Sequence, residues 1–297
     1  MSRATERAAE FQAHRALLFS IAYRMLGSAD EADDVLQDAF LRYESASVDE
    51  IRSPKAFLST IVTRLCLNEL KSARATRETY VGQWLAEPVR TDELVDRNDP
   101  ERQAVDADSI SIAFVSLLQN LTPAERAVFL LREVFGYGYD EIARMLDKSE
   151  AACRQLFSRA RRYVAENRPR FAATPAQHRR ILEAFMRAAG TGDLETLTSV
   201  LTEDVVFWAD GGGKVPGAAL NPVRGRAAVL RFVLGLTRRF MPANATFGFA
   251  DINGRPTILV RNPDGGTSFV VSVEIDHDRI ESVWAIANPD KLRRLST

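Results

Sequence analysis

The sequence is poor in the side chains that build metal and redox sites. Its 297 residues include two cysteines and three histidines. These residues, Cys66, Cys153, His14, His178 and His277, lie far apart in the chain. They have no metal-ligand spacing, and two isolated cysteines are typical of a reducing compartment rather than of a disulfide framework. Cys66 falls within an apolar stripe and is interpreted as a core thiol. We therefore expect no metal, no cofactor and no disulfide.

Long uncharged apolar runs and a strong net charge are also missing. Spanning a bilayer takes about 18 to 20 consecutive apolar residues, and the N-terminal stretch MSRATERAAEFQAHR lacks the apolar centre of a signal peptide. The sequence thus predicts a soluble cytoplasmic protein. Because the formal net charge is −1, any binding to nucleic acid must depend on local basic patches.

The stretch 121–168 has the pattern of a helix-turn-helix that continues into a basic helix. Thr122, Pro123 and Glu125 predict an N-cap, a first-turn proline and a capping box. A second helix follows, and Ser149 is predicted to cap the last one. The connection between these two helices is about three residues, a length typical of a DNA-binding helix pair.

The last of these helices is predicted to expose a basic face. Residues 149–170 contain six arginines against two glutamates, a local charge of +4. The side chains predicted to face DNA are Arg154, Gln155, Ser158, Arg159, Arg161 and Arg162. Arg and Gln pair with base edges in the major groove, and further arginines bind phosphates. A merely solvated surface helix is the alternative interpretation of such a charge run.

The first 78 residues are predicted to form a small helical domain with two oppositely charged surfaces. A first helix should end at Gly27, after which Ser28 and Glu31 cap a second helix. Residues 29–50 hold eight acidic residues against one arginine, a surface that would repel DNA and favour a basic protein partner. The helix that starts at Ser53-Pro54 is basic, and its candidates for binding single-stranded DNA are Thr63, Asn68, Lys71 and Arg74.

Residues 79–107 are predicted to form a linker. The stretch 78–100 loses helical periodicity and contains Gly82, Pro88 and Pro100, the last of which should open a helix. Trp84 and Leu85 are the bulky apolar pair of this stretch, and we expect them to pack against another part of the chain. Its second half is acidic, with Asp92, Glu93, Asp96 and Asp99.

After residue 175 the pattern changes to α+β. Helices are predicted at 176–189, 193–201 and 226–239, and strands at 245–251, 256–261, 268–276 and in ESVWAIAN. The turn signals Asn253-Gly254 and Asp264-Gly265-Gly266 between alternating runs predict a meander of antiparallel strands. Trp208 and Trp284 lie in strand-like runs and are interpreted as core residues.

The helical part of the chain resembles an extracytoplasmic-function (ECF) sigma factor of bacterial RNA polymerase. The resemblance rests on the first helical domain, the acidic spacer and the segment LTPAERAVFLLREVFGYGYDEIARMLDKSEAACRQLFSRARR. It implies a multidomain chain with an all-α sigma-2 domain at 1–78, a linker at 79–107 and an all-α helix-turn-helix sigma-4 domain at 108–170. Asp147 stands where the family leads us to expect glycine in the DNA-binding turn, and aspartate tolerates the left-handed conformation better than most residues.

Residues 176–297 resemble the SnoaL-like, cone-shaped α+β fold with a curved antiparallel sheet. A sigma factor fused to that fold, with WLAEPV at 84–89, DGGGK at 210–214 and NPDK at 288–291, is similar to the sigma-J-like group, although Ala86 replaces the proline of the usual WLPEP. The residues expected between domains are Trp84, Leu85, Glu87, Pro88, Asp210, Gly211, Gly212, Gly213, Lys214, Asn288, Pro289, Asp290 and Lys291. We expect a buried Trp84 indole to anchor this contact, with Lys214 and Lys291 facing the acidic linker residues Glu87, Asp92 and Glu93.

The resemblance implies a factor that directs promoter-specific transcription initiation and is regulated in cis by its C-terminal domain. Its expected partners are RNA polymerase core enzyme and promoter DNA, the −10 element for sigma-2 and the −35 element for sigma-4. Carried over by position, Asp33, Asp34, Gln37 and Asp38 would contact the polymerase. Whether the C-terminal domain binds a small molecule stays open.

Two other function classes also stay open. One is a DNA-binding regulator that senses a ligand and has no polymerase role. The other is an enzyme, since SnoaL-like relatives include cyclases and isomerases that use an Asp or His base. The candidate bases are Asp204, Asp210 and His277. Without geometry no acid/base pair can be assigned, and we expect no catalytic residue.

Overall fold

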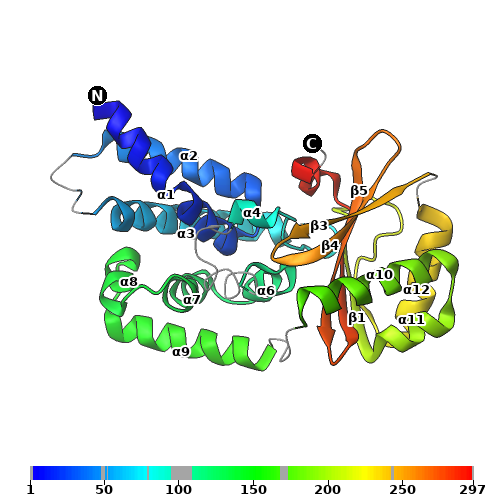
Figure 1. The fold of residues 1–297 in the computed structure, drawn as a ribbon. Coiled ribbons are helices and arrows are strands. Elements are labelled where there is room, and N and C mark those ends of the chain that lie inside the picture. The colour runs from blue at the N-terminus through cyan, green and yellow to red at the C-terminus, as the bar shows by residue number, and fades with distance from the viewer. Residues whose placement is uncertain are drawn as a thin grey trace. The chain divides into compact units, whose positions relative to one another are not determined.

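The computed structural model describes residues 3–47, 51, 53–78, 80–94, 109–167, 173–241 and 244–295, and the chain divides into two compact units (Figure 1). The helical unit comprises Met1–Glu78, Asp92–Ile110 and Phe114–Arg168. The C-terminal unit comprises Thr79–Thr91, Ser111–Ala113 and Pro169–Thr297. The segment 79–91, which joins the two halves of the helical unit, therefore packs with the C-terminal unit.

The first half of the helical unit is a three-helix module, with α1 at Arg3–Leu26, α2 at Ala29–Ser45 and α3 at Pro54–Glu78. Gly27 has a φ of +74° and ends α1, as predicted. The Ser28 side chain accepts a hydrogen bond from the Glu31 backbone N–H (3.3 Å), which confirms the predicted N-cap of α2. Apolar residues of α2 and α3, among them Val35, Leu36, Leu58 and Val62, are buried and contribute to the core between the three helices.

The second half of the helical unit contains the predicted helix-turn-helix. Its elements are α4 (Thr91–Leu94), α6 (Ile112–Leu118), α7 (Pro123–Phe129), the π-helical turn η2 (Leu130–Val134), α8 (Tyr139–Leu146) and α9 (Glu150–Asn167). Both hydrogen bonds of the Thr122–Glu125 capping box are present. Asp147 adopts the left-handed conformation (φ 52°, ψ 55°) and its N–H donates to the Ala143 carbonyl, so the turn is retained without glycine. The helix start predicted at Pro100, with Asp96 and Asp99, lies outside the described residues.

The two helical modules contact each other inside the helical unit. The Tyr137 hydroxyl donates to Ser59 Oγ (2.8 Å). Arg64 donates to the Arg144 and Met145 carbonyl oxygens (3.0 and 2.9 Å), so its positive charge lies at the C-terminal end of α8, where the helix dipole favours a cation. Thr63, expected on an exposed polar face, is fully buried, because this side of α3 packs against α7 and α8. Its burial was not foreseen, since the period of one helix does not reveal a second packed face.

The C-terminal unit is α+β, as predicted. Its helices are α10 (Pro175–Thr191), α11 (Leu194–Val200) and α12 (Arg226–Phe240), and its strands are β1 (Leu201–Asp210), β2 (Val223–Arg224), β3 (Thr246–Ile252), β4 (Arg255–Arg261), β5 (Thr267–Asp276) and β6 (Arg279–Ile286). Strands β3 to β6 form the predicted antiparallel meander in the sheet order β2-β1-β6-β5-β4-β3. The parallel pairing of β1 with β6 was not foreseen.

Both faces of this sheet are covered. On one face, α10, α11 and α12 pack over a large apolar core to which Phe207, Val271 and Val273 contribute (Figure 1). On the other, residues such as Val270, Trp284 and Ile286 pack against Leu85 of the 80–91 segment and against Leu292 and Leu295 of the C-terminal turns. Because neighbouring strand residues point to opposite faces, Val270 and Val271 belong to different cores. The C-terminal turns are η3 (Pro289–Lys291) and η4 (Arg293–Leu295).

The described residues provide no candidate metal cluster of three or more His, Cys, Asp or Glu side chains. None of their helices is long and apolar enough to cross a membrane. Cys66 and Cys153 are free thiols and both are buried. Burial raises the pKa of each thiol above its ordinary value, which keeps the sulfur protonated and unreactive.

Candidate functional site

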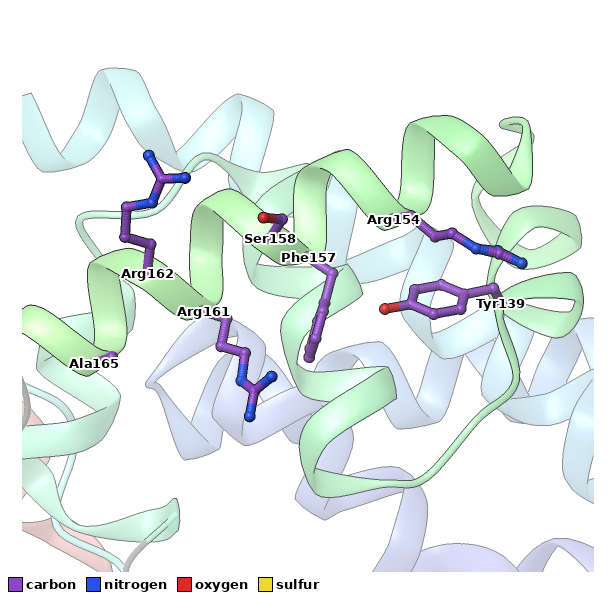
Figure 2. A pocket seen from close by; sticks show the side chains of 7 residues that line it. All are labelled: Tyr139, Arg154, Phe157, Ser158, Arg161, Arg162 and Ala165. Carbon is purple, nitrogen blue, oxygen red and sulfur yellow. The ribbon is translucent and has the colours of Figure 1, made fainter.

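The exposed face of α9 carries every polar side chain that the sequence assigned to it. Arg154, Gln155, Ser158, Arg159, Arg161 and Arg162 are all exposed. The opposite side of the helix buries Cys153, Ala160 and Val164. The face borders an open groove of about 630 Å³ lined by Tyr139, Arg154, Phe157, Ser158, Arg161, Arg162 and Ala165 (Figure 2). A basic, open surface on the second helix of a helix-turn-helix has the chemistry that a DNA major groove requires.

Tyr139, on α8, is a residue of this surface that sequence reasoning missed. The centre of its ring lies 4.8 Å from the Cζ atom of Arg154 (Figure 2). The Cζ atom of Arg132 lies 4.9 Å from the same ring centre. Arg154 also pairs with Glu150 one turn earlier (2.7 Å), and Arg159 pairs with Glu125 (3.1 Å). These contacts hold the two arginines extended while leaving them exposed. The sequence GYGYDE at 136–141 places this tyrosine at the start of a predicted helix, and that position could have indicated its part in the surface.

The candidate surfaces of the first module are partly accessible. Asn68 and Lys71 are exposed on α3, Thr63 is not accessible in this arrangement, and the Arg74 side chain lies outside the described residues. On α2, the side chains exposed among the predicted polymerase contacts are Asp34, Gln37 and Asp38. Asp33 is half-buried and pairs with Arg15 at 2.8 Å.

A second site lies within the C-terminal unit, where Asp210 ends β1. Its side chain is fully buried and both carboxylate oxygens are occupied. Oδ1 accepts from the Tyr80 hydroxyl (2.5 Å) and the Gly212 N–H (3.0 Å). Oδ2 accepts from the Leu85 N–H (3.0 Å) and from Lys291 Nζ (2.7 Å). One carboxylate thus joins the linker, the glycine loop and the C-terminal turn.

Lys291 completes this arrangement from the opposite side. Its ammonium donates to the Leu85 carbonyl oxygen (2.5 Å) as well as to Asp210, and it lies 4.2 Å from the centre of the Trp84 ring. Asn288 donates to the Tyr80 hydroxyl (2.9 Å). Burial and the neighbouring Asp210 carboxylate raise the pKa of Tyr80, so its hydroxyl stays protonated and able to donate. We call Asp210, Asn288 and Lys291, with the segment 80–85 that they hold, the linker clamp.

Two glycines of DGGGK lie so close to neighbouring residues that a larger side chain would not fit there. Gly212 and Gly213 have φ values of +59° and +70°, a region that favours glycine. A Cβ on Gly212 would lie 2.5 Å from the Asn288 amide, and one on Gly213 would lie 2.9 Å from Val81. The loop therefore contacts the linker on one side and the C-terminal turn on another.

Two details of the predicted interdomain contact are wrong. The buried apolar anchor is Leu85, which is 2% exposed, whereas Trp84 is half-buried and covers Lys291. The lysine partners found also differ from those predicted: Lys214 pairs with Asp290, and Lys291 pairs with Asp210. Glu87 instead lies 3.8 Å from Arg294. Pairing inside the C-terminal unit satisfies these lysines, and Pro88 is buried with the linker.

The end of the linker is held by the turn between β3 and β4, which the sequence identified only as a turn. The Val89 N–H donates to Asn253 Oδ1 (2.9 Å), and the Asn253 N–H donates back to the Val89 carbonyl (2.9 Å). The Gly254 N–H donates to Thr91 Oγ1 (3.0 Å). The segment 80–91 is thus fixed near both of its ends within the C-terminal unit.

The candidate catalytic bases are not arranged for catalysis. Asp204 is exposed, and His277 is exposed in the β5–β6 turn with a φ of +44°. All the acceptor positions of Asp210 described above are occupied by protein donors. His178 is buried, where burial lowers its pKa to about 4, and its Nε2 lies 2.7 Å from the Val273 carbonyl oxygen. This geometry favours a structural imidazole rather than a general base.

Comparison with known families and relatives agrees with this geometry. The Sigma-70 region 2 family matches residues 11–76, and the Sigma-70 region 4 family matches residues 111–164. The chain is 38% identical over 292 residues to the ECF RNA polymerase sigma factor SigJ of Mycobacterium tuberculosis, which covers 95% of this chain and 92% of the relative. It is 37% identical over 253 residues to the probable ECF sigma factor SigI of the same species, covering 78% of this chain and 87% of that one.

The crystal structure of the M. tuberculosis SigJ protein is similar over almost the whole chain. The match has a TM-score of 0.74 at 35% identity and covers 96% of this chain and 97% of that one. The likeness includes both the helical unit and the α+β unit. Sigma factors of this kind are transcription initiation factors that work with RNA polymerase core and promoter DNA, which decides against the enzyme and the free-standing regulator. The chain belongs to the family of ECF RNA polymerase sigma factors.

Proposed function

We propose that the C-terminal unit of this sigma factor regulates promoter-specific initiation in cis, by holding the linker between region 2 and region 4. The two regions have to take up a defined separation to reach two promoter elements at once. The connection between them is therefore the part of the chain through which a fused domain controls that separation. A domain that binds the linker in one state and releases it in another shifts the population of promoter-competent chains.

The observation that carries the proposal is the linker clamp. Segment 80–91 lies between the two sigma regions in sequence but packs as part of the C-terminal unit, with Leu85 in its core and its two ends bound by Asp210 and Asn253. Within the helical unit, Tyr137 and Arg64 make hydrogen bonds across the two modules, and Thr63, one turn after Ser59 on α3, is buried. Since the clamped linker occurs together with this closed packing, release of the linker is expected to favour opening.

The assignments of the binding surfaces are part of the same proposal. The exposed face of α9 binds the −35 element through Arg154, Gln155, Ser158, Arg159, Arg161 and Arg162. Asn68, Lys71 and Arg74 on α3 bind the −10 strand, joined by Thr63 once the modules separate. The acidic face of α2 binds the polymerase through Asp33, Asp34, Gln37 and Asp38. The exposure of the six α9 residues and of Asn68, Lys71, Asp34, Gln37 and Asp38, together with the charge of each face, supports these roles.

The functional division proposed is sigma-2 at 1–78, the linker at 79–107, sigma-4 at 108–170 and the regulatory domain at 176–297. A protein that works with RNA polymerase core acts where transcription occurs, and we place it in the cytoplasm on that ground.

Transcription by reconstituted polymerase tests the proposal. The full chain, a chain ending after residue 170 and a Lys291→Met variant are compared on a promoter identified by sequencing the transcripts they initiate. The truncated chain and Lys291→Met should both transcribe more than the full chain, since both free the linker. Lys214→Met is the matched control, because its pair with Asp290 is exposed and contributes about 0–1 kcal/mol. Equal transcription by all four proteins would contradict the proposal.

A further inference from the structure

The C-terminal unit contains a cavity on the helix-covered side of its sheet. Its volume is about 160 Å³, and its walls come from α10, α12, β1, β5, β6 and the loop that follows β1. A dry apolar cavity of roughly 150 Å³ is large enough to bind benzene. The cavity can therefore take a molecule of one aromatic ring.

The chemistry of the walls selects an uncharged aromatic molecule. Phe185, Phe207, Phe240 and Phe269 line the cavity, and aromatic rings pack favourably edge-on against one another. None of the lining residues, all of which are described, is Lys, Arg or His. The single acidic residue, Asp210, is fully occupied by the linker clamp, so it offers nothing to a cation. The Thr237 hydroxyl donates to the Val233 carbonyl (2.7 Å) and can still accept, and the Ser268 hydroxyl also lines the cavity, so the two can serve one polar group such as a ligand hydroxyl.

One short loop forms both a wall of this cavity and a part of the linker clamp. Val215, Pro216 and Ala218 line the cavity, while Gly212 and Gly213 of the same loop contact Asn288 and Val81. The loop is tightly folded, since a Cβ on Gly211 would lie 2.5 Å from the Ala218 Cβ. The Lys214 N–H also donates to the Gly211 carbonyl (2.9 Å). A change on the cavity side is thus transmitted to the clamp side over a few residues.

Phe240 lies at the rim of the cavity. This side chain is 46% exposed although it is aromatic, and it lies over Gly217, where a Cβ would meet its ring at 2.5 Å. An exposed ring at the rim, packed on a glycine of the same loop, can cover a bound molecule without disturbing the rest of α12.

We propose that this cavity binds a small uncharged aromatic molecule bearing one hydroxyl group, and that binding stabilises the linker clamp. The second part rests on the proposed function. A molecule that adds contacts to Val215, Pro216 and Ala218 stabilises the loop in the conformation that holds the linker. By reciprocity, a chain whose clamp is weakened binds the molecule less tightly.

Phenol is the probe, and its binding to the full chain is measured by ligand-observed NMR, with benzoate as the charged control. Phenol should bind with a dissociation constant below about 1 mM, and benzoate should not compete. Ala189→Leu on α10 fills the cavity and should weaken phenol binding at least about tenfold. Arg187→Leu, on the exposed side of the same helix, is the matched control and should leave it unchanged. If Ala189→Leu fails to fold, Leu236→Trp fills the cavity from α12.

The Trp84→Ala variant measures the coupling between the cavity and the linker clamp. Trp84 contacts Lys291 of the clamp and does not line the cavity. Phenol affinity should fall about fivefold in this variant. No phenol binding at millimolar concentration, or equal binding by Ala189→Leu and the parent chain, would overturn the site. Equal affinity in Trp84→Ala would overturn the coupling alone. Neither result bears on the transcription of the truncated chain, so failure of the proposed function is recognised separately.

Discussion

Replacing Asp210 by asparagine should damage the C-terminal unit more than almost any other single change of similar size. The side chain is fully buried and accepts four hydrogen bonds, one of them from the Lys291 ammonium. The asparagine keeps one acceptor oxygen but turns an NH2 group toward donors. Removing one partner of a buried ion pair costs about 3–5 kcal/mol, because the other charge is left without compensation.

Tryptophan fluorescence during urea unfolding measures this cost selectively. All three tryptophans of the chain, Trp84, Trp208 and Trp284, belong to the C-terminal unit. The Asp210→Asn variant should therefore show a lower urea midpoint in fluorescence. A domain of ordinary stability, about 5–15 kcal/mol, would be left marginal by a loss of that size.

A double-mutant cycle with Lys291→Met tests the reason for the loss. Lys291→Met alone should cost less than Asp210→Asn, since three N–H and O–H donors still face the carboxylate. The double variant contains neither charge of this pair and should be more stable than Asp210→Asn alone. Losses that simply add in the double variant would refute the ion-pair explanation, because additivity means that the two groups do not interact.

Three further results are expected. The free energy of unfolding of the C-terminal unit should fall by up to about 3 kcal/mol as the pH is lowered from 6.5 to 4. In this range His178 becomes protonated in the unfolded chain, whereas the buried imidazole of the folded chain, with a pKa of about 4, stays neutral. The test is the urea midpoint as a function of pH, and the same profile in His178→Leu would contradict this explanation. Arg154→Ala should weaken binding to −35 DNA by about 1–3 kcal/mol with loss of sequence preference, whereas equal weakening for all sequences in a binding titration would indicate a phosphate contact. Reversing the charge of the exposed Asp34 and Asp38 should reduce association with core polymerase in a pull-down while −35 DNA binding persists, and unchanged association would count against the acidic face.

Local signals in the sequence predicted the elements of the fold well. The caps at Ser28, Thr122 and Ser149 and the left-handed Asp147 depend on a few neighbouring residues, so short patterns report them. Alternation of apolar residues located the antiparallel meander for the same reason. The exposed face of α9 also followed from one helical period.

The parts that could not be predicted depend on contacts between distant segments. Thr63 is polar and spaced for exposure, but a second module covers it. Trp84 is the larger linker residue, yet Leu85 is the one that packs in a core with Trp284 and Leu292, while the Trp84 indole lies against the Lys291 ammonium. The parallel pairing of β1 with β6 carries Asp210 to the clamp, and no local pattern specifies which strand lies beside β1.

The most direct test of the proposed regulation is initiation by purified core polymerase on genomic DNA, with the 5′ ends of the transcripts sequenced. Three proteins are compared: the full chain, Lys291→Met and the Lys214→Met control. We expect all three to direct the polymerase to the same promoters, with more transcripts from Lys291→Met because its linker is free. If the three proteins give the same 5′ ends in equal abundance, the linker is not the point of control.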